Sequence, residues 1–222
     1  YGWFWDKISP GLEESGPGRL DDALQALAGA KGLAAPRLQL MQEIAQTRGV
    51  QILTESASTQ VSPALALAVI AVESAGKADA ISSAGAQGLM QLMPETGRRT
   101  AKEFHLPYAG QVTLTDPDSN IQLGTAYLRK LMDRFDNNRV LVTAAYNAGP
   151  LNVDKWLPDH GDIDALIWIE NIPYKETRKY VRRVLATDTI FHWRLTGETK
   201  RLLPELTTVS APAVEERLAR TD

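Results

Sequence analysis

Hydrophobic and polar positions alternate at helical spacing along most of the chain, and strand signals are few. The run Ala64–Val72 is apolar around the whole circumference of a helix, which indicates a buried helix and not an amphipathic one. Ser62 and Pro63 suit the N-cap and the first helical position, and Gly76 suits a left-handed residue after the last turn. This pattern predicts a central helix that is buried on all sides and ends at Glu73.

Shorter amphipathic patterns lie on both sides of this run and predict further helices. They are expected over Leu38–Ala45, Val50–Ala57, Pro94–Phe104, Asp116–Phe135, Val140–Tyr146, Asp162–Ile169 and Tyr174–Trp193. No repeat at a solenoid period is present. The predicted fold class is therefore mainly α, a bundle of short helices around a buried central helix.

Both ends of the chain differ in composition from its middle. Residues 1–35 begin with five residues rich in aromatics and continue through a Gly- and Pro-rich stretch; Asp21 or Asp22 could cap a short helix that ends near Gly29. The terminal aromatics either pack on their own domain, the commoner outcome, or bind a sugar or a partner. Residues 200–222 resemble a tail, with a short terminal helix conceivable at 214–219. The predicted organisation is an extension over 1–35, a domain over 36–199 and a tail over 200–222.

Composition excludes several classes of function. A formal net charge of -3 and a pI of about 5.7 over 222 residues give no indication of nucleic acid as a partner. The three histidines are scattered without metal-ligand spacing, there is no cysteine, and nucleotide-binding and nucleophile-elbow motifs are missing. We expect no cofactor and no metal.

No apolar stretch approaches the roughly 18 residues that cross a bilayer, so no transmembrane segment is predicted. Because the chain begins at Tyr1, any export signal is expected to have been removed.

Glu73 is the main candidate for catalysis. Its carboxyl closes an apolar helix, where partial desolvation and the negative end of the helix dipole both favour the protonated acid. A carboxyl that stays protonated near neutral pH is what a general acid for glycoside cleavage requires. For an isolated glutamate, a surface position at a frayed helix end would be the simpler interpretation.

Three more segments with polar or aromatic side chains lie at predicted helix ends, where side chains can converge on a groove. Together with Glu73-Ser74, they are GLMQLMP over residues 88–94, AYNAGP over 145–150 and IPYKETRKYV over 172–181. In this order and spacing they resemble the catalytic domain of the soluble lytic transglycosylases, relatives of goose-type lysozyme. The resemblance covers about residues 50–197 and includes the DP-x-x-N-I-x-x-G-x-x-YL stretch over 116–128. No part of the large superhelical N-terminal domain of some members is expected in these residues, so the resemblance implies nothing for the first 50 residues.

The resemblance implies a lysozyme-like fold with a substrate groove, and cleavage of the β-1,4 bond between N-acetylmuramic acid and N-acetylglucosamine in peptidoglycan. The product would carry a 1,6-anhydro ring, and Glu73, which matches the single catalytic acid of the family, would act first as acid and then as base. A second carboxylate is then not required, unlike in most glycosidases. The resemblance also implies that the enzyme works in the periplasm.

The matched motifs supply a set of expected substrate-binding residues, namely Ser74, Gln91, Met93, Tyr146, Asn147, Glu176 and Tyr180. Each has a purely structural alternative. Ser74 could only end its helix, Met93 could fill the core, and Glu176 could be a solvated charge paired with a neighbouring cation. Gln91 could be a solvated turn residue, and the tyrosine–asparagine pair could be a core ring and a helix cap.

Two rival functions remain open at this point. The nearer one is a hydrolytic muramidase, and the more distant one is a wall-binding or assembly module that has kept the groove. The terminal segments leave room for a secretion, pilus or flagellar assembly protein as a partner.

Overall fold

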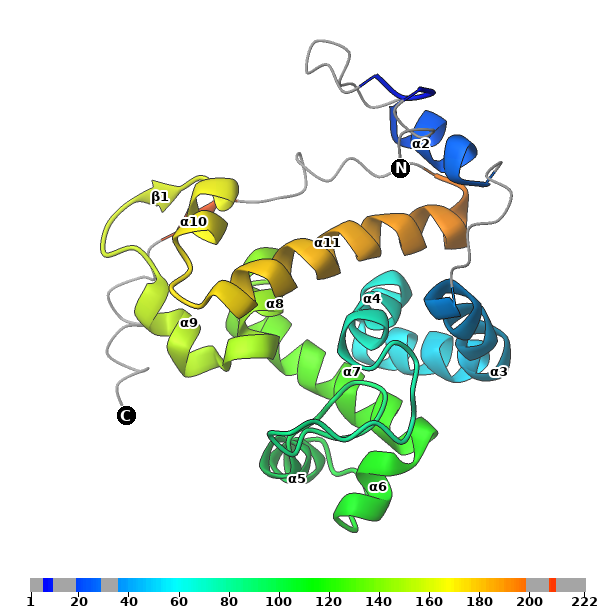
Figure 1. Cartoon of the computed structure of the whole chain (residues 1–222). Coiled ribbons are helices and arrows are strands. Elements are labelled where there is room, and N and C mark those ends of the chain that lie inside the picture. The colour runs from blue at the N-terminus through cyan, green and yellow to red at the C-terminus, as the bar shows by residue number, and fades with distance from the viewer. Residues whose placement is uncertain (1–5, 10–18, 29–35, 199–207, 211–222) are drawn as a thin grey trace.

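The computed structural model describes residues 6–9, 19–28, 36–198 and 208–210 (Figure 1). The helices and strands within them are, in chain order, α2 Arg19–Ala28, α3 Pro36–Thr59, α4 Pro63–Glu73, α5 Pro94–Glu103, α6 Gln111–Thr115, α7 Pro117–Arg134, α8 Arg139–Ala148, α9 Pro150–Trp156, β1 Asp162–Ile163, α10 Ala165–Asn171, α11 Lys175–Thr196 and β2 Val209–Ser210. The prediction of a mainly α fold is confirmed.

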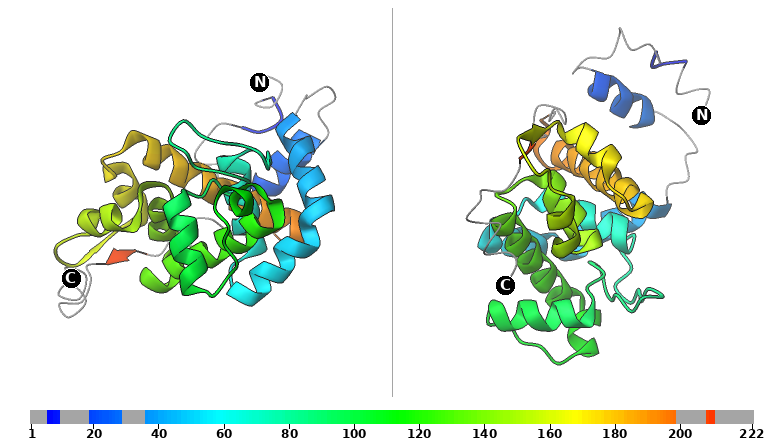
Figure 2. Two further views of the ribbon diagram at one scale, coloured as in Figure 1. Left: turned by 90° about the horizontal axis from the view of Figure 1, so that it is seen from below. Right: turned by 90° about the vertical axis from the view of Figure 1, so that its left-hand side faces the viewer.

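Helix α4 is the buried helix that the sequence predicts. Ser62 is its N-cap residue, Pro63 occupies its first turn, and residues 64–70 are all buried. Beyond the last turn, Gly76 has a φ of 85°, the left-handed conformation expected of it. Helix α11 packs along α4 and also contacts α8, while α3 packs against both α4 and α7. The views in Figures 1 and 2 agree that α11 lies between α4 and α2.

Two predicted helices are one in the structure. The patterns over 38–45 and 50–57 belong to the single helix α3, which runs through Gly49 without a break. A mid-helix glycine costs only about 1 kcal/mol relative to alanine. The burial of Ile44 and Ile52 against the core outweighs that cost.

Other helix boundaries also differ from the prediction. Pro150 does not simply turn the chain; it begins α9, because proline is favourable in the first turn of a helix. The predicted helix over 162–169 begins only at Ala165, because the Asp164 side chain accepts hydrogen bonds from two backbone N–H groups and caps α10 there. Asp21 and Asp22 lie inside α2, which begins at Arg19. Helix α6 was not predicted.

A short antiparallel pair joins the segment predicted as a tail to the domain. Asp162 pairs with Ser210 and Ile163 pairs with Val209, so β1 and β2 form a two-stranded sheet. Val209 is fully buried in the hydrophobic core. The terminal aromatics and the helix conceivable at 214–219 lie outside the described residues, and the predicted domain boundaries stay predictions.

Candidate active site

Glu73 is the last residue of α4, and its side chain is half-buried. Burial raises the pKa of its carboxyl to about 7, against an ordinary value of 4.5. A hydrogen bond from Tyr180 opposes this shift, and the negative charge of Glu176 adds to it. Desolvation outweighs the hydrogen bond, so the acid is protonated in a large share of molecules at neutral pH.

Tyr180 bridges the two central helices at this carboxyl. Its hydroxyl donates a hydrogen bond of 2.7 Å to Glu73 Oε1, and its side chain is buried in α11. Burial raises the pKa of Tyr180 well above its ordinary value, so the phenol stays neutral and remains a donor. Because Tyr180 occupies Oε1, the proton of a neutral Glu73 is left on Oε2.

Ser74 ties the end of α4 to the loop over residues 88–93, which we call the GLMQLM loop. Its buried hydroxyl donates to the Leu89 carbonyl oxygen at 2.7 Å and accepts from the Gly76 backbone N–H at 3.1 Å. The Ser74 hydroxyl therefore fixes the loop beside the acid, and its expected role in substrate binding stays a prediction.

Asn120 holds the same loop from the other side. This fully buried side chain accepts from the Met90 N–H at 2.8 Å and donates to the carbonyl oxygens of Leu114 at 2.8 Å and Gln87 at 3.1 Å. All three hydrogen bonds of its amide are thus made inside the protein. Sequence reasoning missed this role, although Asn120 belongs to the matched stretch over 116–128.

Gln91 and Met93 lie in the GLMQLM loop, and the structure gives them different surroundings. The Gln91 amide donates to the Gly88 carbonyl oxygen at 2.8 Å and to the Ala80 carbonyl oxygen at 2.9 Å. Its donors therefore stabilise the loop, and its backbone adopts a left-handed φ of 47°. Met93 is 43% exposed, which is inconsistent with a role as core filler.

Tyr146 and Asn147 lie in the last turn of α8, next to the acid and the loop. The Tyr146 hydroxyl donates to the Met90 carbonyl oxygen at 2.8 Å, and burial raises the pKa of this tyrosine, with a further contribution from the charge of Glu73. The Asn147 amide oxygen accepts from the Thr177 hydroxyl at 2.7 Å, which joins α8 to α11. Asn147 is not the helix cap, because Gly149 occupies that position.

Glu176 lies in the first turn of α11 and is exposed. None of the ion pairs found within the described parts of the chain involves it. Its neighbour Arg178 donates instead to the Ile172 carbonyl oxygen. The charge of Glu176 therefore remains available to act on Glu73 one helix away.

The structure thus brings Glu73, Tyr180 and Glu176 into one electrostatic unit, with the GLMQLM loop and the end of α8 around it. Tyr127, missed by sequence reasoning, adds a ring contact to Tyr146 at a centroid distance of 5.4 Å. Within the described residues there is no group of three or more side chains that could hold a metal ion. In the same residues no single helix is long and apolar enough to cross a membrane. Residues 43–59 of α3 and helix α4, bent by 120°, reach the required length and apolar composition only when they are taken together.

Comparison with known families agrees with this geometry. The family described as "Transglycosylase SLT domain" matches residues 51–169, more than half of the chain. A second family, "Soluble lytic transglycosylase helical domain", matches residues 171–199, which contain α11.

Curated relatives are similar in sequence but much longer. A soluble lytic murein transglycosylase of Salmonella typhimurium is 42% identical over 147 residues, which is 65% of this chain and 23% of the relative. One from Escherichia coli K12 is 45% identical over 130 residues, which is 58% of this chain and 20% of the relative. The chain therefore spans about a fifth of the length of these relatives.

Solved structures share the fold. The lytic transglycosylase Slt of Pseudomonas aeruginosa, solved as an inactive mutant, superposes with a TM-score of 0.70 and 34% identity, covering 82% of this chain and 29% of that one. A complex of the 70-kDa soluble lytic transglycosylase with bulgecin A superposes with a TM-score of 0.66 and 32% identity, covering 84% of this chain and 29% of that one. The prediction of a lysozyme-like transglycosylase fold is thereby confirmed.

Proposed function

The chain belongs to the transglycosylase SLT domain family, and from that premise we propose that it is a peptidoglycan lytic transglycosylase. The observation that carries the proposal is the Glu73 carboxyl, whose pKa burial raises to about 7. At neutral pH both of its protonation states are accessible, so one group can give a proton and later take one. The names of the relatives, soluble lytic murein transglycosylases, support the same activity.

The proposed reaction cleaves the β-1,4 bond between N-acetylmuramic acid and N-acetylglucosamine. Neutral Glu73 donates its proton to the bridging oxygen, the bond from this oxygen to the muramic anomeric carbon breaks, and the N-acetylglucosamine hydroxyl leaves. The Glu73 carboxylate then takes the proton of the muramic 6-hydroxyl as that oxygen bonds to the anomeric carbon. A 1,6-anhydro ring forms, no water is consumed, and Glu73 is protonated again.

In this mechanism Tyr180 and Glu176 influence the protonation of Glu73 and do not react themselves. Tyr180 holds Oε1 by its hydrogen bond and stabilises the carboxylate formed after the first step. Glu176 disfavours that carboxylate through its charge and so helps to return the proton. That a structural relative was made inactive by replacing one glutamate with glutamine supports an essential glutamate in this fold.

We assign the remaining predicted residues to binding of the glycan strand. Met93 and Asn147 would contact the sugars directly, because one is exposed and the other carries an amide at the end of α8. Ser74, Gln91 and Tyr146 would act through the GLMQLM loop, because their hydroxyl or amide groups bond to its backbone.

The test is digestion of purified sacculi followed by mass analysis of the fragments. We expect anhydro-muropeptides, each one water lighter than the product of a lysozyme. Glu73→Gln should remove nearly all activity, whereas Glu103→Gln, which neutralises an exposed glutamate of α5, should keep it. Products with reducing ends would identify a hydrolytic muramidase instead. Wall binding without any cleavage would identify a binding module.

We further propose that the enzyme works in the periplasm and that its terminal segments recruit a secretion, pilus or flagellar assembly protein. This proposal is supported by the extra chain on both sides of the matched residues 51–199. Deletion of residues 1–35 should abolish recruitment of the partner while wall cleavage continues. Equal recruitment by the shortened chain would contradict the proposal.

A further inference from the structure

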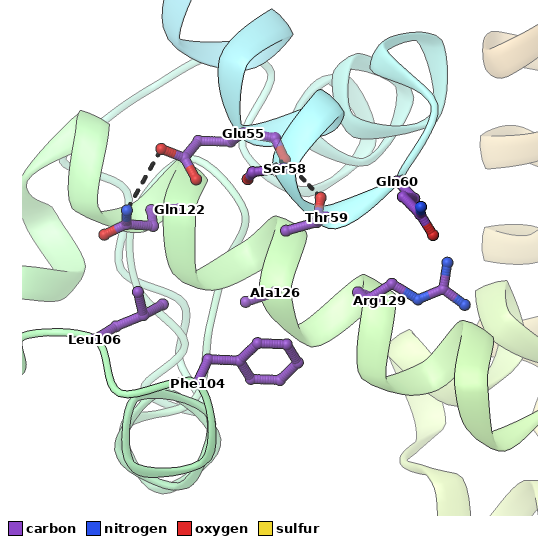
Figure 3. Close-up of a pocket in the computed structure, with 9 residues that line it drawn as sticks. All are labelled: Glu55, Ser58, Thr59, Gln60, Phe104, Leu106, Gln122, Ala126 and Arg129. Atoms are coloured by element: carbon purple, nitrogen blue, oxygen red, sulfur yellow. Dashed lines mark hydrogen bonds between the residues drawn. The ribbon is translucent and has the colours of Figure 1, made fainter.

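A pocket of about 270 Å³ lies away from the candidate active site, between the end of α3, helix α7 and the residues that follow α5 (Figure 3). Helix α7 separates the two places. Asn120 and Tyr127 face the GLMQLM loop and Tyr146, whereas Gln122, Ala126 and Arg129 line the pocket. The latter three recur at i, i+4 and i+7 and so share the opposite helix face.

Glu55 is the polar centre of one end of this pocket. Its side chain is only 9% exposed, and its Oε1 accepts hydrogen bonds from Gln51 at 3.0 Å and from Gln122 at 3.4 Å. Both donors are neutral amides, and within the described residues no lysine, arginine or histidine pairs with this carboxylate. A carboxylate this deeply buried ordinarily has a cationic partner. The Oε2 atom has no hydrogen-bond partner among the described residues, so it is the atom to which a ligand can donate.

Arg129 marks the opposite end. Gln122 and Arg129 are seven residues apart on α7, so about 10 Å of helix axis separates the ends of the pocket. The Nη2 atom of Arg129 donates to Asp133 at 2.6 Å and to Asn137 at 3.1 Å. Its Nε is buried without an acceptor within the described part of the chain. A buried Nε is closed to a ligand, so the donors left for an anionic group are those of Nη1, beside the Asp133 carboxylate that pairs with Nη2.

The wall between these two ends is apolar. Phe104 and Leu106 come from the segment after α5, and Ala126 comes from α7 (Figure 3). An aliphatic chain could pack along these three side chains, whereas a free metal ion would leave them uncovered. A lysine-length chain between two charged groups is comparable in length to the about 10 Å of α7 between Gln122, which bonds to Glu55, and Arg129.

We propose that this pocket binds an amino acid or short peptide that carries an ammonium group and a carboxylate at opposite ends of an aliphatic chain. The ammonium group donates to Glu55 Oε2, the carboxylate lies toward Arg129, and the chain packs on Phe104, Leu106 and Ala126. The proposal does not depend on the activity proposed above, because it concerns binding on the other face of α7.

The experiment is calorimetric titration of the whole chain with Nα-acetyl-lysine, which carries an ammonium group and a carboxylate at its two ends. Two matched probes remove one charge each: Nα,Nε-diacetyl-lysine lacks the ammonium group, and Nα-acetyl-lysine amide lacks the carboxylate. We expect each probe to bind at least about tenfold more weakly than the parent compound, because each loses a charge-assisted hydrogen bond. N-acetylglucosamine should not bind in this pocket.

Three single substitutions test whether the probe binds at Glu55. Glu55→Gln keeps the shape of the side chain and one acceptor oxygen for Gln51 and Gln122 but removes the charge and the second acceptor, so affinity for Nα-acetyl-lysine should fall at least about tenfold. Glu43→Gln removes the same charge from an exposed position on the same helix and should leave affinity unchanged. Glu73→Gln should also bind normally, which separates this proposal from the catalytic one. Circular dichroism would confirm that all three variants are folded.

Several outcomes would overturn the proposal. The first two are an absence of binding to the unaltered chain and equal binding of the diacetylated probe. Undiminished affinity in folded Glu55→Gln would show that the probe binds elsewhere. Displacement of Nα-acetyl-lysine by N-acetylglucosamine would identify the pocket as a sugar site.

Discussion

Glu73 is subject to two opposing influences of its own neighbours. Burial at the end of an apolar helix disfavours its charged form, and the Tyr180 hydroxyl favours it. The pKa of about 7 shows that burial has the larger effect. A neutral carboxyl at this position is therefore a property of folding, since the same group in the unfolded chain would have its ordinary value near 4.5.

Stability should consequently depend on pH through this residue. Because the folded pKa lies above the unfolded one, the contribution of Glu73 to stability is fully present below about pH 4.5 and is lost as pH rises to about 7. The size of the effect is on the order of 3 kcal/mol. Glu73→Gln carries no charge to desolvate, so we expect it to equal the unaltered chain at about pH 4 and to exceed it in stability at about pH 8.

Urea unfolding of both proteins at the two pH values measures this difference. Comparing the two proteins cancels the titration of every other group. A stability difference that does not change with pH would show that Glu73 has an ordinary pKa in the folded chain. It would also remove the main support for its role as an acid.

Tyr180 offers a second test at the same carboxyl. Tyr180→Phe removes the hydrogen bond that lowers the pKa of Glu73, so that pKa should rise above 7, and the fall of kcat/KM at high pH should move to higher pH. Tyr146→Phe is the matched control, because its hydroxyl bonds to the Met90 carbonyl oxygen and not to Glu73. For Tyr146→Phe we expect no such displacement of the pH profile, whatever the change in rate. Equal profiles for Tyr180→Phe and the unaltered chain would contradict the assignment of Tyr180.

The sequence alone predicted that the Glu73 carboxyl favours its protonated form, because an apolar run that ends in a glutamate can be recognised from the sequence. It did not predict which atoms the neighbouring side chains would reach. Ser74 and Gln91 were expected near the substrate, yet their polar groups bond to backbone carbonyl oxygens of a loop. The Ser74 contact joins residues 15 positions apart and the Gln91 amide reaches Ala80, 11 positions away; local patterns do not encode how such segments meet.

At the scale of elements, the GLMQLM loop is held by close approach as well as by hydrogen bonds. A Cβ atom built on Gly88 would lie 2.2 Å from the Leu114 carbonyl oxygen and 2.3 Å from the Asn120 amide nitrogen. These two atoms also hydrogen-bond to each other. The loop can therefore reach α7 only because residue 88 has no side chain.

Two glycines of similar backbone conformation make this testable. Gly88 and Gly85 have φ values of 79° and 90°, but a Cβ at Gly85 would meet nothing within 4 Å. Gly85→Ala should lose only about 1–2 kcal/mol of stability through its strained conformation. Gly88→Ala should lose at least about 2 kcal/mol more, because the Asn120 bonds must also break. Chemical unfolding of both variants measures the difference, and equal losses would show that the close approach is unimportant.

Helix boundaries were predictable where a cap or a proline marks them. Asp116-Pro117 begins α7 as expected, and the Asp116 side chain caps it. Boundaries were missed where two patterns belong to one helix, as over 38–45 and 50–57 in α3, and where a Gly-Pro pair begins a helix, as at Pro150 in α9. Either residue is compatible with both outcomes, and packing against the rest of the protein decides between them.

At the scale of the whole molecule, α7 organises two distinct places. One face carries Asn120 and Tyr127 toward the candidate active site, and the other carries Gln122 and Arg129 into the pocket with Glu55. The first could be predicted because its residues belong to recognisable motifs. The second could not, because its residues come from three segments with no shared sequence signal.

The segment predicted as a tail also contributes to the whole molecule. Val209 is fully buried in the core, β2 pairs with β1, and the Asn138 side chain donates to the Thr208 carbonyl oxygen at 3.0 Å.

A chain ending at Glu198 should therefore unfold at lower temperature than one ending at Ser210, which keeps all three contacts. Loss of the Val209 side chain alone should cost about 2 kcal/mol. Thermal unfolding of the two truncated chains and of Val209→Ala measures the contribution, with exposed Ser210→Ala as the control. Equal melting temperatures for the two truncations would show that residues 208–210 only rest on a domain that is already complete.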